Sequence, residues 1–429
     1  MTGEAYSKSA VEERTRHWLE ANYIAAFANL DDPSRGVYDA EGRLQRLTQY
    51  GFQEVQRKLK IFRWLDRFQF DSFIDVGSGF DYYPKLVRER YGVSAAYYSD
   101  FAHSMNLPYG GDVFGKLDHA VTLNIARLPF ADDAFDVVLS SEVLEHLVRP
   151  VEAIAELLRV ARKYVVMTSL EALSTNRWQR LLSHLRVDVS QPHVERNFFL
   201  LHELEAIFGA DWRHENLFYD PDLPAGAFKS AAARDAAYRA LDNVDDFAAA
   251  LYAATRVTDH RTGSMGILIV KAKPGAATGP PSGDDRNLAR WLIERTGAGQ
   301  AALYSLVGQI RSGTAAFAEP DRPVAAELLA RVRCPDCRGI LTQVAGGLRC
   351  AGCSTIFPAE YGVPILHPIR HPDPRPEHEW LARLAGNDFQ RRDIVQRVAR
   401  RLRRNEQAPG PLRRLFHEAD RALGKRAGS

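Results

Sequence analysis

The sequence predicts an α/β protein with a doubly wound, mostly parallel sheet and a small zinc ribbon near the C-terminus. Two observations carry this prediction. From residue 72 onward, short apolar runs alternate with longer segments of helical periodicity, which is typical of a parallel sheet covered by helices. All four cysteines fall between Cys334 and Cys353 in two Cys-x-x-Cys pairs, which indicates a metal site rather than a disulfide framework.

The strands and helices of the sheet can be placed in order along the chain. The apolar runs expected to form strands cover residues 72–79, 94–101, 135–142, 163–170 and 266–273. Residues 81–92 can supply the first crossover helix. Residues 149–162 can supply a later one, because Pro150 stands at a first-turn position that proline favours. This alternation is what a doubly wound sheet requires.

The remainder of the chain divides into segments of different character. Residues 1–70 carry helical patterning with aromatic anchors, and residues 71–273 form the α/β domain. An alanine-rich, helical insertion at 220–262 interrupts that domain and is a candidate substrate lid. The other predicted segments are an interdomain linker at 274–286, a helical connector at 287–330, the ribbon at 331–368 and a basic helical tail at 369–429.

Composition sets few limits on function. The chain has 429 residues, enough for two or three domains, and its formal net charge of +2 selects no class of partner. We find no apolar stretch as long as the roughly 18 residues that a membrane span needs, and the N-terminus is polar rather than signal-like. We therefore expect a cytoplasmic protein without a transmembrane segment. The arginine-rich tail is expected to be a solvated or partner-docked helix, with contact to anionic lipid or nucleic acid as the alternative.

A glycine loop carries the strongest chemical signal before the cysteines. In residues 74–84, IDVGSGFDYYP, an acidic residue lies near the end of a strand, and Gly77 and Gly79 let the backbone approach a ligand closely. Asp100 lies at the end of the next apolar run, about twenty residues further on, where a carboxylate can accept both hydroxyls of a ribose. The pattern indicates a nucleoside-containing cofactor.

The loop argues against a dinucleotide as that cofactor. A dinucleotide loop uses a third glycine for close helix packing and places a pyrophosphate at the helix N-terminus. In this sequence Asp81 stands at the third position, and its charge would repel the pyrophosphate. A cationic sulfonium cofactor meets no such repulsion, so the acidic loop favours S-adenosylmethionine.

The segment that follows gives the pattern a family. Residues 124–147, NIARLPFADDAFDVVLSSEVLEHL, resemble the class I (Rossmann-like) S-adenosylmethionine-dependent methyltransferases, in particular the branch that acts on small molecules such as quinones, sterols and sugars. The resemblance covers roughly residues 70–170, with 266–273 as a closing strand. It implies a cofactor site made of Asp75, Gly77, Ser78, Gly79, Asp81, Asp100, Phe101, Asn124, Ile125 and Ser141.

Within this set the resemblance implies distinct roles. The residues from Asp75 to Gly79 are expected to line the methionine moiety, Asp100 to hold the ribose, and Asn124 with Ile125 to flank the adenine. Asn124 departs from the family, which often has an aspartate there, although an asparagine carbonyl can accept the same hydrogen bond. Asp81 also departs, because it replaces a glycine and would either recruit the cofactor's ammonium group or obstruct it.

The reacting groups are expected after the fourth predicted strand. Residues 140–147, SSEVLEHL, place Ser141, Glu142, Glu145 and His146 there. His146 is the candidate general base, because its unperturbed pKa lies near neutrality, and the alternative is a capping or supporting role for its ring. Glu142 is the second candidate catalytic residue and would orient substrate or cofactor.

The same position bears on the methyl acceptor. Methyltransferases that act on planar amine nitrogens carry Asn or Asp followed by Pro-Pro-Tyr, and this chain has Ser-Ser-Glu-Val instead. A hydroxyl or an activated carbon is therefore the favoured acceptor. We expect a small or carrier-linked metabolite, such as a sugar, a polyketide-like product or a lipid-linked intermediate.

The cysteine spacing predicts a closed structural zinc site. Cys334 and Cys337 form one knuckle, and Cys350 and Cys353 form the second after twelve intervening residues. Gly346 and Gly347 can make the hairpin turn between them. A redox pair is the alternative, disfavoured because neither motif follows a strand and opens a helix.

The residues after the cysteines carry a second resemblance. Residues 354–368, STIFPAEYGVPILHP, are similar to the small zinc-ribbon activator subunit that partners tRNA, rRNA and release-factor methyltransferases. This implies an activator fused in cis, which packs on the catalytic domain by strand addition or through an apolar face.

Three functional hypotheses follow. The first is methyl transfer to a hydroxyl or activated carbon of a small or carrier-linked metabolite. The second is RNA or protein methylation with the activator in cis, which the missing Pro-Pro-Tyr motif disfavours, so nucleic acid is not the favoured partner. The third is a non-catalytic binding or scaffold protein with a degenerate methyltransferase fold. The sequence makes no prediction of oligomeric state.

Overall fold

The computed structural model describes residues 49–79, 82–108, 112, 114–144, 150–170, 212–219, 232–233, 245, 248, 264–271, 285–314, 319 and 321–370. Most of the predicted N-terminal helical region, of the insertion at 220–262 and of the linker lies outside these residues, as does the basic tail from residue 371. Among the described residues, no helix combines the length and apolar character needed to cross a membrane.

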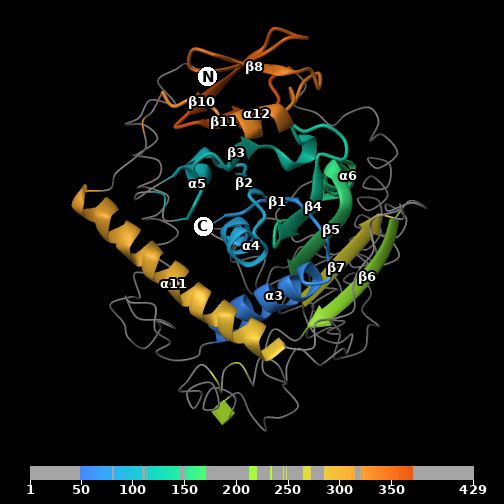
Figure 1. Ribbon diagram of the computed structural model, residues 1–429, viewed down its shortest axis with the longest axis vertical. Coiled ribbons are helices and arrows are strands. Elements are labelled where there is room, and N and C mark those ends of the chain that lie inside the picture. The colour runs from blue at the N-terminus through green and yellow to red at the C-terminus, as the bar shows by residue number, and fades with distance from the viewer. Residues whose placement is uncertain are drawn as a thin grey trace, which may run out of the picture.

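The described chain is organised around one eleven-stranded sheet with the order β6-β7-β5-β4-β1-β2-β3-β11-β10-β9-β8 (Figure 1). Its first seven strands are β1 (Ser72–Val76), β2 (Ala95–Asp100), β3 (Ala120–Leu123), β4 (Phe135–Ser141), β5 (Ala161–Leu170), β6 (Trp212–Tyr219) and β7 (Ser264–Lys271). Strands β1 to β5 pair in parallel, and β7 is antiparallel to both β5 and β6. The predicted doubly wound, mostly parallel sheet is confirmed.

The burial of the central strands and the strand order show where this sheet can bind a ligand. All five residues of β1 and all seven of β4 are buried, as expected for central parallel strands covered on both faces. The chain runs outward from β1 to β2 and β3, and then returns to the other side of β1 for β4 and β5. The direction of winding therefore reverses between β1 and β4, and ligands of such sheets bind at the carboxyl ends of the strands at this switch point.

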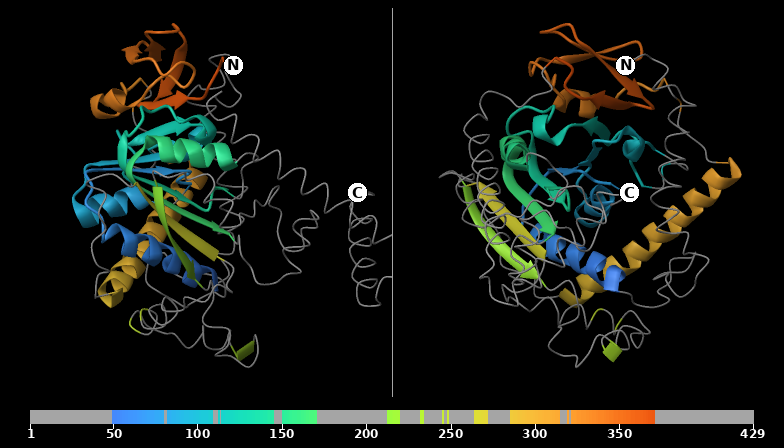
Figure 2. Two further views of the ribbon diagram at one scale, coloured as in Figure 1. Left: turned by 90° about the vertical axis from the view of Figure 1, so that its right-hand side faces the viewer. Right: turned by 180° about the vertical axis from the view of Figure 1, so that it is seen from behind.

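Helices cover both faces of the sheet. They are α3 (Gln49–Leu65), α4 (Tyr83–Tyr91), α5 (His103–Asn106), the 3-10 helix η4 (Ile125–Arg127), α6 (Pro150–Val160), α11 (Asp285–Ser312) and α12 (Ala326–Arg331). Figure 2 shows α4 and α11 on one face and α6 on the other. Both predicted crossover helices are present: α4 ends at Gly92 in the left-handed conformation, and α6 begins at Pro150.

The last four strands belong to the part of the chain that contains the cysteines, residues 321–370, which we call the cysteine unit. These strands are β8 (Leu341–Val344), β9 (Gly347–Cys350), β10 (Ile356–Glu360) and β11 (Val363–Leu366). Strand β11 pairs in parallel with β3, with Ile365 beside Thr122 and Leu366 beside Leu123. Strand addition, one of the two expected modes of packing, is observed, and the unit extends the sheet beyond β3.

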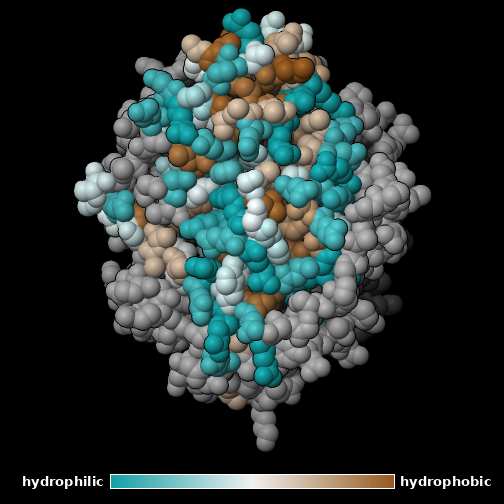
Figure 3. Space-filling view, viewed as in Figure 1, coloured by the Kyte–Doolittle hydropathy of each residue, from teal (hydrophilic) through white to brown (hydrophobic). Residues whose placement is uncertain are grey.

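The cysteine unit and the parallel sheet share one hydrophobic core. Ile74 and Val138 of the central strands lie in the same buried cluster as Val332, Phe357 and Leu366 of the unit. An isolated bridge between Phe130 and Val332 adds a second backbone connection. The unit also has exposed apolar side chains, among them Ile340 at 63% exposure. Figure 3 shows hydrophobic surface at the top of the view, where the cysteine unit lies.

Candidate cofactor and metal sites

The glycine loop that follows β1 is held by hydrogen bonds to β2. The backbone N–H groups of Gly77 and Ser78 both donate to the carbonyl of Ser99, at 2.9 and 2.8 Å. The Ser78 hydroxyl donates to the Asp75 carbonyl at 2.9 Å and accepts from the Ser99 N–H at 3.1 Å. The Ser78 side chain is therefore committed to the fold, and the loop offers a ligand its backbone.

The two predicted glycines meet different demands. Gly77 has φ +84°, and a Cβ there would lie 2.4 Å from a methyl carbon of Val143. Gly79 has φ +53°, and its Cβ would meet no atom of the described residues within 4 Å. Both positions need left-handed backbone, which glycine adopts without strain. Gly77 is required by packing, whereas the space beside Gly79 is open to a ligand.

Asp100 connects this loop with the end of β2. Its carboxylate accepts hydrogen bonds from the N–H of Gly79 and the N–H of Ala102, each at 3.0 Å. The residue is partly exposed, and each carboxylate oxygen retains a second acceptor site. Asp75, in contrast, is 1% exposed and lies within β1. Of these two carboxylates, Asp100 is the one that can reach a ligand from this edge.

A buried lysine supports the loop from the other side. The Nζ of Lys116 donates to the Gly79 carbonyl at 3.3 Å and to the Met105 carbonyl, and it lies 5.4 Å from the centre of the Tyr98 ring. Lys116 is only 4% exposed. Sequence reasoning missed it, because a single lysine before a strand forms part of no pattern, and its contact spans 37 residues.

The predicted adenine side lies at the ends of β2 and β3. Asn124 caps η4 by accepting from the Ala126 N–H through Oδ1 at 3.0 Å, and Ile125 is buried at 9% exposure. Phe101, directly after Asp100, is 65% exposed. The structure therefore brings a half-buried amide, an aliphatic side chain and an open aromatic ring to the same edge as the glycine loop.

The end of β4 carries strained backbone. Glu142 has φ +55°, a region that non-glycine residues seldom occupy and that clusters at functional sites. Its N–H donates to the Thr168 carbonyl at 3.0 Å, which holds this conformation. Its Oε1 is buried and has no hydrogen-bond partner among the described residues.

The other residues predicted near this strand end give less information. The Ser141 hydroxyl shares a 2.8 Å hydrogen bond with the Thr168 hydroxyl. Asp81, Glu145 and His146 lie outside the described residues.

The four cysteines converge as the spacing predicts. All four sulfurs lie within 4.8 Å of one another, and the pairs Cys334–Cys353 and Cys337–Cys350 are 3.6 and 3.4 Å apart. A disulfide needs about 2.05 Å, whereas tetrahedral zinc with bonds of about 2.3 Å separates its sulfurs by about 3.8 Å. The sulfur set therefore has the size and composition of a cluster that could bind zinc.

The backbone around the sulfurs suits a metal. A Cβ on Gly339 would lie 2.9 Å from the Cys350 sulfur, so glycine leaves the space that the thiolates need. The Gly352 N–H donates to the Cys350 sulfur at 3.3 Å. Burial opposes ionisation of Cys353, but hydrogen bonds with Thr355 prevail and lower its pKa to about 6. The lowered pKa favours the thiolate form of Cys353, whereas burial raises the pKa of Cys334 and Cys337.

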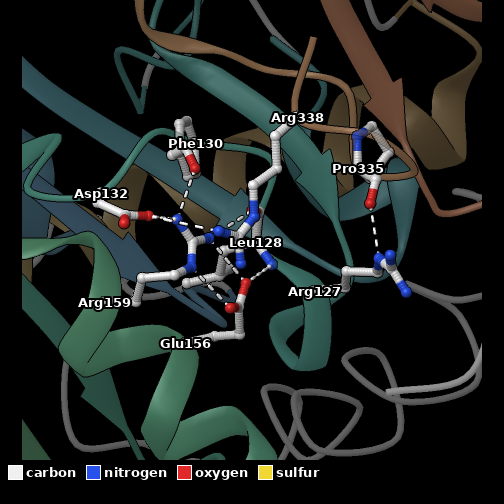
Figure 4. Close-up of polar contacts among 8 residues, drawn as sticks. All are labelled: Arg127, Leu128, Phe130, Asp132, Glu156, Arg159, Pro335 and Arg338. Atoms are coloured by element: carbon white, nitrogen blue, oxygen red, sulfur yellow. Dashed lines mark hydrogen bonds and ion pairs between the residues drawn. The ribbon is translucent and has the colours of Figure 1, made fainter. Parts of the chain in front are cut away.

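Arg127 joins the cysteine unit to the parallel sheet (Figure 4). Its Nε donates to the Pro335 carbonyl at 2.6 Å and its Nη2 to the Asp336 carbonyl at 3.2 Å, both between the first two cysteines. The Arg333 N–H donates to the Pro129 carbonyl at 2.7 Å. Arg127 is 7% exposed, so these are buried contacts of a charged group.

A second network fixes the loop that carries Arg127. Glu156 of α6 accepts from the Leu128 N–H at 2.7 Å and from the Arg159 Nε at 2.7 Å (Figure 4). Arg159 donates to the carbonyls of Leu128 and Phe130, at 2.9 and 2.8 Å. Glu156 is fully buried. Sequence reasoning used this loop only as a family signature and missed its structural task, because the partners are distant in sequence.

Comparison with protein-family models gives one match. Residues 74–167 match the family described as a methyltransferase domain. The matched segment begins in β1 and ends in β5, and it contains the glycine loop, Asp100 and Glu142. The expected methyltransferase with a class I α/β fold is confirmed. A search of curated proteins finds no match.

A search of solved structures finds similarity to several methyltransferases. A complex of the Haloferax volcanii Trm112 methyltransferase activator with a methyltransferase has 16% identity and TM-score 0.35, covering 52% of this chain and 93% of that one. A methyltransferase from Archaeoglobus fulgidus has 18% identity and TM-score 0.32, covering 51% and 94%. The YcgJ protein from Bacillus subtilis has 15% identity and TM-score 0.34, covering 50% and 98%.

Proposed function

We propose that this protein transfers the methyl group of S-adenosylmethionine to a hydroxyl or activated carbon of a small or carrier-linked metabolite. One observation carries the proposal: at the switch point of a methyltransferase sheet, the open space beside Gly79 adjoins the Asp100 carboxylate, which accepts from the Gly79 N–H at 3.0 Å. A glycine loop with open space next to a carboxylate at the end of the following strand is the arrangement that nucleoside cofactors require.

In this proposal the cofactor lies across the carboxyl ends of β1, β2 and β3. Gly77 and Gly79 face its methionine moiety, and the free acceptor sites of Asp100 receive the ribose hydroxyls. Phe101, Asn124 and Ile125 flank the adenine. The bound cofactor supplies an electrophilic methyl group, and the protein supplies alignment and proton removal.

Proton removal falls to the residues after β4. Glu142 lies beside the switch point with its backbone in the left-handed region. Its Oε1 lacks a hydrogen-bond partner among the described residues. We assign it the role of orienting the acceptor or the cofactor. His146, four residues further on, remains the proposed general base, since its ordinary pKa suits proton transfer near neutral pH.

For the cysteine unit we propose a structural zinc site in a ribbon that acts as an activator fused in cis. The sulfur distances fit zinc, and all four thiolates are used, so no position is left for catalysis. Strand β11 gives the unit its place beside β3, and Arg127 holds the first knuckle.

A second candidate function is methylation of RNA or protein. The observation that favours it is the pairing of β11 with β3, because it attaches the cysteine unit, which resembles the activator of RNA and protein methyltransferases, to the sheet. The sequence Ser-Ser-Glu-Val after β4, in place of the planar-amine motif, opposes it. We therefore keep a small or carrier-linked acceptor as the first choice.

Two measurements test the proposal. Calorimetric titration with S-adenosylhomocysteine should show one binding site per chain, and a full-length protein that does not bind it would overturn the assignment in favour of a scaffold role. Methyl-labelled S-adenosylmethionine should then be supplied with small-molecule, RNA and protein fractions, using Asp100→Ala as the inactive control. Label is expected in the small-molecule fraction, whereas label in RNA or protein would establish the second candidate.

A further inference from the structure

The carboxyl end of β11 reaches the same edge of the sheet as the candidate cofactor site. Ile365 pairs with Thr122 and Leu366 with Leu123 in parallel register. Continued by one residue, this register places His367 next to Asn124, at the predicted adenine side. The cysteine unit thus places His367 at the carboxyl edge of the sheet, where the other residues come from the methyltransferase domain.

His367 contacts Phe101. Their ring centres are 4.7 Å apart and the ring planes meet at 63°, an edge-to-face arrangement. The His367 ring also hydrogen-bonds to the backbone of Phe101. Phe101 nevertheless remains 65% exposed, so His367 leaves much of its surface open. An exposed aromatic face held by an edge contact is a platform on which a purine can stack.

Burial lowers the pKa of His367, the hydrogen bond with Phe101 opposes this shift, and nearby His103 adds to it. The ring is therefore neutral at neutral pH, and its contact with Phe101 is an aromatic one.

A buried polar cluster that includes His103 lies near His367. His103 Nδ1 shares a 2.8 Å hydrogen bond with the Thr122 hydroxyl, which lies on β3. The other ring nitrogen of His103 lies 3.6 Å from the Glu360 carboxylate of β10. These contacts join α5, β3 and the cysteine unit in one buried polar cluster.

We propose that His367 is a positioning residue of the adenine subsite, which orients Phe101 so that cofactor affinity depends on the cysteine unit. This inference rests on the proposed function. Without His367, Phe101 would sample several rotamers, and ordering the ring on binding would weaken cofactor affinity. Aromatic pairs contribute about 0.5–1.5 kcal/mol, so we expect a loss of roughly three- to tenfold in affinity.

A double-mutant cycle tests this role, with S-adenosylhomocysteine as the probe and calorimetry as the measurement. His367→Ala should weaken binding about three- to tenfold and leave the metal content of the protein unchanged. His367→Phe, which keeps an aromatic edge, should recover most of the affinity. In a Phe101→Ala background, His367→Ala should have no further effect, because its action passes through Phe101.

His119 provides the matched control. It is another partly buried histidine, with its ring 5.7 Å from Tyr97, but it precedes β3 and so lies at the opposite edge of the sheet. His119→Ala should bind the probe as the wild type does. Unchanged affinity in His367→Ala, or an equal loss in the Phe101→Ala background, would overturn the inference. Failure of the wild type to bind would instead refute the proposed function.

Discussion

At the scale of single residues, the carboxyl edge of the sheet is built on left-handed backbone. Gly77, Gly79 and Glu142 all have positive φ, between +53° and +84°. Glycine adopts this region freely, so the glycine pair could be recognised in the sequence. A glutamate gives no such signal, and only the fold shows that the Thr168 carbonyl holds Glu142 in this conformation.

The two glycines should respond differently to alanine. Gly77→Ala introduces both a left-handed alanine and an overlap at 2.4 Å with Val143, so we expect it to lower the free energy of unfolding by about 2 kcal/mol or more. Gly79→Ala has open space and should cost only about 1 kcal/mol, while its methyl group reduces cofactor affinity. Urea unfolding and ligand titration of both variants separate the effects. Equal behaviour of the two variants would contradict the assignment of the open space.

Asp100→Ala should weaken S-adenosylhomocysteine binding. The ribose hydroxyls lose a charged acceptor worth about 1.5–3 kcal/mol, which corresponds to roughly a 10- to 100-fold change in affinity. The Gly79 N–H loses its partner as well, so the loop becomes less ordered. Asp118→Asn is the control, because this carboxylate pairs with Arg322 ahead of β3, away from the carboxyl edge. Calorimetry of the folded variants decides, and wild-type affinity in Asp100→Ala would remove Asp100 from the site.

At the scale of elements, the apolar runs of the sequence predicted five strands of the methyltransferase sheet and missed β3 and β6. The runs at β1, β2, β4, β5 and β7 were recognised. Strand β3 has only four residues, and β6, WRHENLFY, mixes charged with aromatic residues. The family resemblance implied only packing by strand addition or through an apolar face. The pairing of β11 with β3 was not predicted, because strand partners that are distant in the chain leave no periodic signal in one sequence.

Contacts between elements were beyond sequence reasoning for the same reason. Arg127, Glu156 and Arg159 are ordinary charged residues in the sequence, yet in the structure they fix the loop between β3 and β4. Their partners are backbone carbonyls and N–H groups, which any sequence supplies. Only the three-dimensional arrangement determines which of them are reached.

Arg127→Ala should loosen the first cysteine knuckle. The carbonyls of Pro335 and Asp336 lose a buried charged donor, so we expect a loss of about 2 kcal/mol or more in stability. Zinc transfer from the loaded protein to a chelator should also become faster. Arg349→Ala is the matched control, since this arginine lies exposed on β9. Identical chelation rates for the two variants would show that Arg127 does not support the metal site.

At the scale of the whole molecule, the methyltransferase sheet and the cysteine unit form one folded body. They share a sheet, a hydrophobic cluster and the buried contacts of Arg127. Unfolding of one part should therefore destabilise the other part. This predicts a single cooperative transition for the described core rather than two independent ones.

Cys350→Ser tests this cooperativity. Three remaining thiolates hold a structural zinc poorly, and a unit this small depends on its metal for folding. The variant should lose zinc by elemental analysis and melt at a lower temperature than the wild type in one transition. Ala351→Ser, at an exposed neighbouring position, should retain both zinc and stability. A sheet that melts at the wild-type temperature after the loss of zinc would show that the two parts fold separately.

The candidate cofactor site and the sulfur cluster belong to one sheet, and β11 carries His367 to the carboxyl edge where the candidate cofactor site lies. The most direct test is titration of the full chain with S-adenosylhomocysteine before and after zinc is removed by a chelator, at a temperature where circular dichroism shows the parallel sheet folded in both samples. We expect one binding site in the zinc-loaded protein and an affinity weakened about threefold or more in the stripped protein. Equal affinity in the two samples would contradict it.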